Sequence, residues 1–175
     1  MSEDKNIDLG AHGILAVEED FGIEIRKNGT WLHQGRPIRR MALVKLFATV
    51  LRIDENGVYW LQTPVERGRI AVEDKPFVAV EMQVKPSGNG QNLLFRTNLD
   101  EWVTVDAAHP LLFDDTPYVM VRDGLAARLN RATYYALMDV AEPAVEDPRI
   151  YGVRSGGMFF PVARLPDKDR EEQEE

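Results

Sequence analysis

The amino-acid sequence predicts an α+β protein made of two similar small units, each a β-hairpin followed by a helix and a second β-hairpin. Two segments carry apolar residues at helical spacing, and each lies between stretches rich in β-branched and aromatic residues. The 175 residues suffice for one domain or for two small ones. We expect an acidic lead-in at residues 1–21, a first unit at 22–75, a second unit at 76–165 and an acidic tail at 166–175.

Composition and charge narrow the class of protein. The chain has 29 acidic and 21 basic residues, a formal net charge of −8 and no cysteine, which excludes disulfide scaffolds, zinc ribbons and thiol nucleophiles. The acidic N-terminus is unlike a signal peptide, and the densest apolar stretch, Ala42–Leu51, is too short to cross a bilayer. We therefore expect a cytoplasmic protein. Residues 22–70 nevertheless carry nine basic against four acidic side chains, a local charge of +5.

The first unit is predicted to open with a hairpin, preceded by a short helix around Gly13–Glu19. Ile23, Ile25 and Trp31 are the strand residues on either side of Asn28-Gly29. That dipeptide favours a tight turn because both residues tolerate a positive φ.

A helix is predicted after the hairpin, with Pro37 in its first turn, where a missing amide hydrogen has no cost. Its apolar face consists of Leu43, Leu46, Phe47, Val50 and Leu51. Turn residues at 54–57 end this helix, and strands are expected at Val58–Thr63 and Arg69–Val72.

The second unit is predicted to contain more strands, at about residues 77–84, 93–97, 102–106, 111–113 and 118–121. Asp123 occupies the position of a helix N-cap. The apolar face of the helix after it consists of Leu125, Leu129, Ala132, Ala136, Leu137 and Val140. Glu142-Pro143 ends that helix, and a closing hairpin is expected at Ile150–Val162.

The two halves share an order of elements. Residues 31–65 and residues 118–162 both run from a strand through a turn, a helix and another turn to strands, and aligning Leu43 with Leu129 pairs further residues of the two predicted helices. We hypothesise an ancient duplication. The alternative is that α+β domains repeat this order by chance.

Familiar catalytic and cofactor motifs are absent from the sequence. It has no glycine-rich dinucleotide or phosphate loop, its 3 histidines are widely spaced, and no serine lies in a nucleophile elbow. We therefore expect a non-enzymatic protein with no cofactor and no metal. The less favoured alternative is a metal-dependent phosphohydrolase that uses Glu66, Asp100 or Asp123.

Two groups of residues near the first predicted helix are candidates for ligand binding. Arg36 and Arg39 lie at the helix start, where guanidinium groups bind anions in a bidentate manner. Trp31 and Gln34 offer a ring and an amide that suit a planar ligand. The structural alternatives are solvated or ion-paired arginines and a tryptophan that packs in the core.

Two further groups complete the candidate set. Thr63 and Glu66 place a hydroxyl and a carboxylate at a strand end, where Glu66 either binds a ligand hydroxyl or pairs with a neighbouring arginine. Asn98 and Arg122 are the candidates from the second unit. The Arg154–Gly157 segment offers backbone donors, with a plain hairpin turn as its alternative.

Several segments resemble a bacterial family, domain-of-unknown-function family 1285 (DUF1285). The resemblance covers about residues 22–163 and is carried by Asn28–Ile38, Leu43–Phe47, Tyr59–Glu66, Phe95–Asn98, His109-Pro110, Tyr118–Gly124, Leu129–Arg131 and Ser155–Pro161. His33 departs from it, because a tyrosine is expected there. The resemblance implies two related α+β units, the second loosely similar to pleckstrin-homology (PH) folds, with a nucleotide-like ligand between them and a signalling role. It implies no catalytic residue.

The leading hypothesis is a cytoplasmic ligand-binding or sensory module for an anionic, nucleotide-like ligand held between the two units. Arg36, Arg39 and Arg122 would hold the anion, and Trp31 would stack on the ligand. Gln34, Thr63 and Asn98 would orient it, and Glu66 would bind a ligand hydroxyl. The alternative is a protein-interaction module, with a signalling protein as partner and no small ligand. Nucleic acid and membrane are not expected as partners, because the chain as a whole is acidic.

Overall fold

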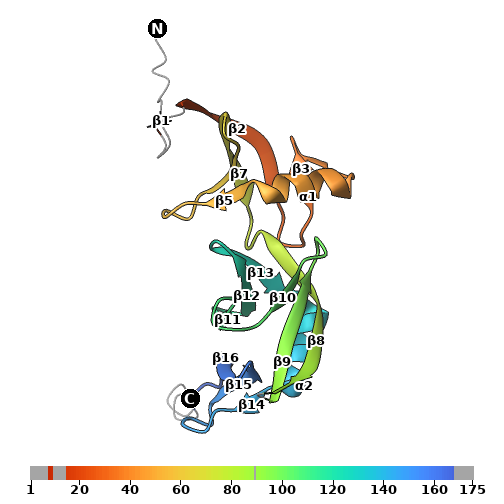
Figure 1. Cartoon of the computed structure of the whole chain (residues 1–175), viewed down its shortest axis with the longest axis vertical. Helices are drawn as coiled ribbons and strands as arrows, with labels where there is room; N and C mark the ends of the chain where they lie inside the picture. The colour runs from red at the N-terminus through yellow and green to blue at the C-terminus, as the bar shows by residue number, and fades with distance from the viewer. Residues whose placement is uncertain (1–7, 10–14, 89, 168–175) are drawn as a thin grey trace, which may run out of the picture. The chain divides into compact units, whose positions relative to one another are not determined.

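The structure is a computed structural model that describes residues 8–9, 15–88 and 90–167. The chain divides into two compact units: unit 1 comprises the residues up to Phe77 with Asp123–Leu125, and unit 2 comprises Val78–Arg122 and the residues from Ala126 on. In the described residues, each unit contains strands and one helix (Figure 1), which is consistent with the predicted α+β protein.

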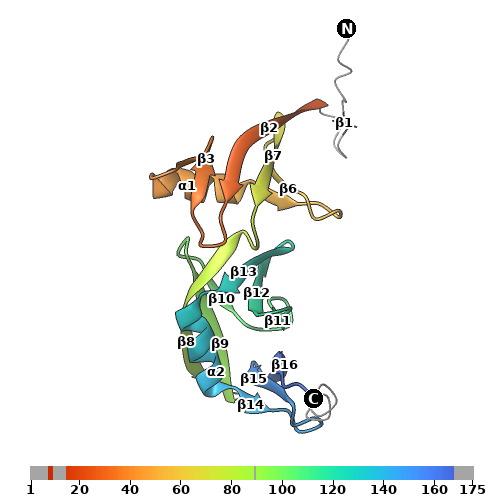
Figure 2. The same ribbon diagram turned by 180° about the vertical axis from the view of Figure 1, so that it is seen from behind.

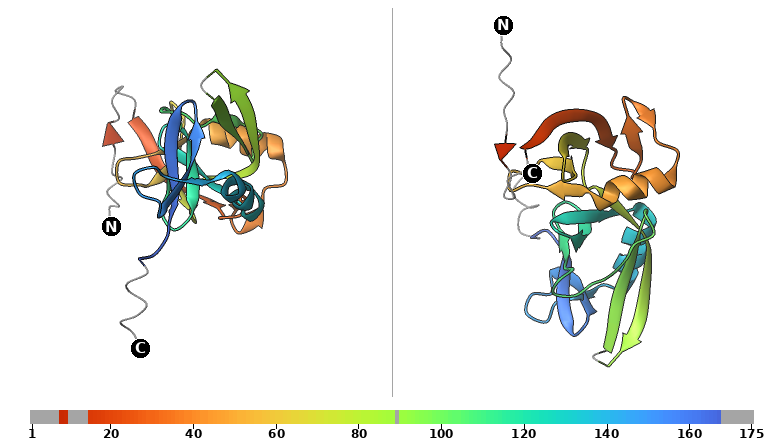
Figure 3. Two further views of the ribbon diagram at one scale, coloured as in Figure 1. Left: turned by 90° about the horizontal axis from the view of Figure 1, so that it is seen from below. Right: turned by 45° about the horizontal axis from the view of Figure 1, so that its top comes forward.

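Unit 1 is a seven-stranded sheet with one helix. Its strands are β1 (Asp8–Leu9), β2 (Leu15–Ile25), β3 (Trp31–His33), β4 (Arg36–Pro37), β5 (Leu51–Ile53), β6 (Tyr59–Gln62) and β7 (Glu66–Val72). They follow the order β4-β3-β2-β7-β6-β5, with β1 on β2. The β2–β7 pair is parallel and the other pairs are antiparallel. The helix is α1 (Met41–Thr49), and β2 forms a curved strand (Figure 3).

The predicted hairpin of unit 1 is confirmed. Ile25 lies opposite Trp31 across β2 and β3, both are buried, and Gly29 has a φ of 89° in the turn between them. A second tight turn, Gln34-Gly35, leads into β4 with φ values of 48° and 77°.

Three local predictions for unit 1 are wrong. The expected short helix at Gly13–Glu19 is strand from Leu15 on, because residues 17–20 pair with β7; Gly13 itself lies outside the described residues. Pro37 lies in the edge strand β4, where a missing amide donor is tolerated, and α1 begins only after Arg40. The helix ends at Thr49, because Leu51 is fully buried in the sheet as part of β5.

Unit 2 has two sheets and the helix α2 (Arg131–Val140). The six-stranded sheet has the order β10-β9-β8-β13-β12-β11, and the three-stranded sheet has the order β14-β15-β16. The strands are β8 (Phe77–Ser87), β9 (Gly90–Thr97), β10 (Trp102–Thr104), β11 (Leu111–Phe113), β12 (Pro117–Arg122), β13 (Leu125–Leu129), β14 (Glu142–Pro143), β15 (Ile150–Ser155) and β16 (Met158–Arg164). Helix α2 lies behind the β8–β9 hairpin in Figure 1 and in front of it in Figure 2.

The start of the second helix differs from the prediction. Asp123 and Gly124 have φ values of 46° and 78° and form the two-residue turn between β12 and β13. Leu125–Leu129 is therefore strand, and α2 begins after Asn130, whose side chain accepts a hydrogen bond from the Thr133 amide at 2.9 Å. The segment misled the prediction because a short apolar run fits a central strand as well as a helix.

The repeated order of elements holds, although the residue alignment behind it does not. Leu43 lies in α1, whereas Leu129 lies in β13, so aligning them pairs a helix with a strand. The order hairpin, helix, three-stranded meander nevertheless occurs twice, as β2-β3-α1-β5-β6-β7, with the short strand β4 inserted before α1, and as β12-β13-α2-β14-β15-β16. This order is consistent with a duplicated unit.

The two sheets of unit 2 are joined by a buried serine. The Ser155 hydroxyl donates to the Val105 carbonyl at 2.6 Å and accepts from the Leu93 amide at 2.8 Å, so β15 is attached to β9. Both the serine and Leu93 are fully buried. Neither described helix has the length and apolar character needed to span a membrane.

Candidate functional site

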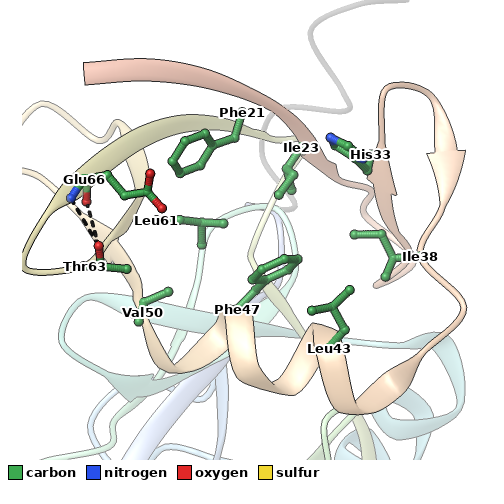
Figure 4. Close-up of a pocket in the computed structure, with 10 residues that line it drawn as sticks. All are labelled: Phe21, Ile23, His33, Ile38, Leu43, Phe47, Val50, Leu61, Thr63 and Glu66. Atoms are coloured by element: carbon green, nitrogen blue, oxygen red, sulfur yellow. Dashed lines mark hydrogen bonds between the residues drawn. The ribbon is translucent and has the colours of Figure 1, made fainter. Parts of the chain in front are cut away.

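A pocket of about 460 Å³ lies in unit 1 between α1 and the sheet (Figure 4). Its apolar side chains are Phe21, Ile23, Ile38, Leu43, Phe47, Val50 and Leu61, and its polar ones are His33, Thr63 and Glu66. We call it the apolar pocket. Its volume falls within the range of small-molecule sites, which are also mostly apolar with a few polar groups.

One face of α1 and the residue just beyond it form the floor of the apolar pocket. Leu43 and Phe47 lie one turn apart, and Val50 continues the same row at the end of the helix. At a rise of 1.5 Å per residue, this row is about 10 Å long. The Phe47 ring stacks on Trp31 with a centroid distance of 6.5 Å, and Trp31 is only 2% exposed. The floor is therefore supported by the core.

A bulge in β2 places Phe21 in the opposite wall. The register of β2 against β7 shifts between Asp20 and Glu24, and Gly22 has a φ of 61°. The Gly22 amide donates to the Asp20 carboxylate at 2.8 Å, and its carbonyl accepts from the Gln34 amide at 2.8 Å. Gly68 leaves room for the Phe21 ring, since a Cβ on Gly68 would lie 2.1 Å from Phe21 Cδ2.

One end of the apolar pocket reaches the edge of the sheet. Ile23 lies opposite His33, and His33 lies opposite Arg36, so the three side chains form a row on one face of the sheet. A polar hollow adjoins this end; it is lined by His33, Gln34, Arg36, Pro37 and Ile38 and shares two of these residues with the apolar pocket. Within the described part of the chain, the Arg36 guanidinium has no ion-pair partner.

Glu66 and Thr63 form the other end of the apolar pocket. They close the β6–β7 turn, in which the Thr63 amide donates to the Glu66 carbonyl at 2.9 Å and the Glu66 amide donates to the Thr63 hydroxyl at 3.2 Å. The Glu66 carboxylate points into the pocket (Figure 4). Among residues 15–88 and 90–167, no cation pairs with it.

The structure brings together two pairs of the residues predicted from sequence. Thr63 and Glu66 line the apolar pocket, and Gln34 and Arg36 line the polar hollow beside it. Arg39 is exposed between β4 and α1 and lines neither.

The other predicted residues have structural contacts. Trp31 is buried against Phe47, as in its core-packing alternative. In unit 2, the Asn98 side chain accepts from the Val78 amide at 3.0 Å, and the Arg122 guanidinium lies 3.6 Å from the Glu101 carboxylate.

Sequence reasoning missed most of the wall of the apolar pocket. The sequence places Phe21 in the acidic lead-in, Leu43 and Phe47 on the apolar face of a helix and Leu61 within a strand, and none of them among the candidate binding residues. One signal for the wall was present: a glycine after an aromatic residue in a strand, as in Phe21-Gly22, marks a bulge that redirects the side chain.

A second cluster in unit 1 has a structural role. The Trp60 indole donates to the Asp54 carboxylate at 2.9 Å, and the Arg67 guanidinium lies 3.7 Å from the centre of the indole ring. The hydrogen bond from Trp60, with others from the backbone of the β5–β6 turn, lowers the pKa of Asp54. The described residues contain no group of three or more histidine or carboxylate side chains placed to hold a metal ion.

Comparison with known proteins places the whole fold in one family. The model of the N-terminal domain of DUF1285, a domain of unknown function, matches residues 16–75, and the model of the C-terminal domain matches residues 76–162. A crystal structure of a DUF1285 family protein from Silicibacter pomeroyi DSS-3 has a TM-score of 0.78 and 34% sequence identity, covering 94% of this chain and 90% of that one.

A second DUF1285 family crystal structure, from Shewanella baltica OS155, has a TM-score of 0.56 and 30% identity, covering 67% of this chain and 91% of that one. A comparison with curated proteins finds no match. The two domain models together span most of the chain, and they confirm the resemblance seen in the sequence. The chain belongs to the DUF1285 family.

Proposed function

We propose that unit 1 is a small-molecule-binding module whose ligand has an apolar body and an anionic group. The observation that carries this proposal is the apolar pocket, with about 460 Å³ of open space between α1 and the sheet. Protein interiors are close-packed, so a space of this size lined by seven apolar side chains leaves hydrophobic surface in contact with water. A ligand that covers this surface gains about 25 cal/mol per Å² of apolar area.

The residues at the edge of the sheet support an anionic group on the ligand. Arg36 lies on the same face as His33 at the open end of the apolar pocket and borders the polar hollow. A guanidinium that has no ion-pair partner among the described residues favours a carboxylate or a phosphate, which it binds through two parallel hydrogen bonds. Arg39, also exposed and close in sequence, would strengthen the positive potential there.

A nucleotide is the second candidate for the anionic ligand. Arg36 at the polar hollow favours its phosphate, as expected from sequence. The apolar pocket favours an aliphatic or aromatic body instead, because the polar groups of a base and a ribose would be left without partners against its walls. For a nucleotide, binding between the two units with contacts to Asn98 and Arg122 is proposed on the sequence alone.

A sensory role in signalling, a PH-like fold for unit 2 and a cytoplasmic location form the broader proposal. A ligand pocket in one of the two units supports sensing. Ligand binding there would change the populations of the protein's conformations, and a protein partner would respond to that change. The absence of cysteine suits a reducing compartment.

The test is thermal unfolding against a panel of alkyl carboxylates, aromatic carboxylates, alkyl phosphates and nucleotides. A ligand at 100 times its dissociation constant stabilises a protein by about 2.7 kcal/mol. For a chain of this size, that corresponds to a rise in Tm of roughly 5–11 °C. We expect this rise for the compounds with an apolar body. A rise for nucleotides alone would favour the second candidate.

A pair of tryptophan variants on α1 locates the binding site. Leu43→Trp fills the apolar pocket and is expected to abolish the rise in Tm, whereas Leu46→Trp is the control, because Leu46 is 61% exposed on the same helix. Equal effects of the two substitutions on the ligand response would overturn the placement. A flat panel would overturn the proposal and favour a protein-interaction module.

A further inference from the structure

We infer that the ligand of the apolar pocket is bipolar: opposite its anionic group, it carries an ammonium or another hydrogen-bond donor that binds Glu66. This inference rests on the proposed function and concerns the class of ligand that the pocket selects. Its starting point is that the two ends of the apolar pocket have opposite character. Glu66 stands at one end, and His33 with Arg36 stands at the other.

The position of the Glu66 carboxylate is built into the fold. Its residue is the first of β7, which pairs with β6 on one side and with β2 on the other. Two hydrogen bonds to Thr63 fix the turn before it. Residues alternate along a strand, so Glu66 lies on the same face as Gly68, over which the Phe21 ring packs. The carboxylate is therefore directed at the apolar wall and away from the arginines of β7.

A wholly apolar ligand would be penalised at this end. In the free protein, Glu66 is exposed and hydrated. A ligand that fills the pocket removes part of that water, and a desolvated carboxylate without a partner costs free energy. A donor on the ligand restores the lost hydrogen bonds, and charge-assisted bonds of this kind are the stronger ones. The cost of desolvating Glu66 therefore weakens the binding of simple fatty chains, and specificity arises mainly from this cost.

The distance between the two ends limits the length of the ligand. Glu66 is on β7 and His33 on β3, with β2 between them, and they are also displaced along β2, because Glu66 lies opposite Val17 and His33 lies opposite Ile23. The row Leu43–Val50, which forms the floor of the apolar pocket between these ends, is about 10 Å long. The ligand class is therefore an elongated apolar molecule of about this length, with an anion at one end and a cationic or donor group at the other.

Three probes of equal chain length test the inference: octanoate, octylamine and omega-aminooctanoate, each titrated calorimetrically into the wild type, Glu66→Gln and Glu55→Gln. Glu55 is an exposed glutamate in the β5–β6 turn and does not line the pocket, so its variant is the matched control. We expect the wild type and Glu55→Gln to prefer omega-aminooctanoate over octanoate about tenfold or more, as a charge-assisted hydrogen bond predicts. Glu66→Gln should lose this preference.

The outcomes separate this inference from the proposed function. If octanoate binds the wild type in a manner that Leu43→Trp abolishes, but the preference is absent or survives in Glu66→Gln, the bipolar ligand is wrong and the binding module stands. If none of the three probes binds, both are overturned. Circular dichroism and the Tm of each variant without probe establish that a lost preference is not caused by unfolding.

Discussion

Gly68 decides where the Phe21 ring lies. Glycine is needed at this position for space and not for its backbone angles, since its φ is outside the left-handed region. A Cβ would lie within 2.3 Å of three atoms of the Phe21 ring. The close contact between the ring and the β7 backbone therefore shapes one wall of the apolar pocket.

Gly68→Ala should lower the free energy of unfolding by about 1–3 kcal/mol, as overpacking does. In a Phe21→Ala background, the same substitution should become slightly stabilising, because alanine has a smaller entropic cost than glycine in a strand, by about 0.5–1 kcal/mol. Urea unfolding of the four proteins in this cycle measures the coupling between the two sites. Equal costs of Gly68→Ala in both backgrounds would show that the ring does not occupy this space.

Asp54 stabilises the β5–β6 turn only while it is ionised. Its carboxylate accepts hydrogen bonds from the Trp60 indole and from the amides of Asn56 and Val58. These bonds, the indole bond first, lower the pKa of Asp54 below its ordinary value. Since the pKa is lower in the folded state, the contribution to stability is present above the unfolded value of about 4 and is lost as the pH falls below it.

The substitution Asp54→Asn should therefore reduce stability at pH 7, and its difference from the wild type should shrink at acidic pH. Urea unfolding between about pH 7 and pH 3, across the carboxyl range, measures this difference. Asp139→Asn is the control, because Asp139 is exposed on α2 and makes no ion pair within the described residues. A difference between Asp54→Asn and the wild type that stays constant over the range would contradict the account.

The elements differ in how their ends are determined. Helix α2 begins at a side-chain cap, because Asn130 accepts a hydrogen bond from the Thr133 amide. Helix α1 has no such cap at Arg40 and ends where Leu51 joins the sheet. The start of α2 is therefore determined by a local hydrogen bond, and the end of α1 is determined by tertiary packing.

Asn130→Ala should cost about 1 kcal/mol of stability, as the loss of an N-cap typically does. Asn130→Ser should retain most of that free energy, because its hydroxyl also accepts from the third amide of the helix. Chemical unfolding measures the free energy of unfolding of each variant, and circular dichroism of the folded variants measures their helix content. Equal stabilities of the alanine and serine variants would show that the cap does not stabilise α2.

Most elements were predictable from sequence, and the errors share a cause. Asn28-Gly29 and the alternating strands of unit 2 are local patterns, and the structure confirms them. The misplaced start of α2 and the missed strand at residues 15–20 depend on pairing with distant strands, which a local pattern does not contain. Tertiary contacts override local preference at these positions.

At the scale of the whole molecule, the same order of elements is used in two ways. In unit 1, the meander after the helix returns to the hairpin through the parallel β2–β7 pair, so one sheet curves over α1 and the apolar pocket forms beneath it. In unit 2, the corresponding meander forms a separate sheet, and β13 pairs with β8. The repeat therefore does not give the two units the same sheet.

The candidate site was only partly predictable for the same reason. Thr63, Glu66, Gln34 and Arg36 were found from their residue types, because polar groups at strand ends and turns are rarely needed for packing. The apolar wall resembles any core in sequence. The pocket exists because α1 and the sheet leave space between them, and only the three-dimensional arrangement shows this.

Methyl NMR shows whether a ligand binds between α1 and the sheet of unit 1, because methyl groups line the apolar pocket. In a titration with octanoate or omega-aminooctanoate, we predict shifts for the methyl groups of Ile23, Leu43 and Val50, which line the apolar pocket. The methyl groups of Leu111 and Leu137, fully buried in unit 2, should not shift. Shifts confined to unit 2, or none at saturating probe, would contradict the account.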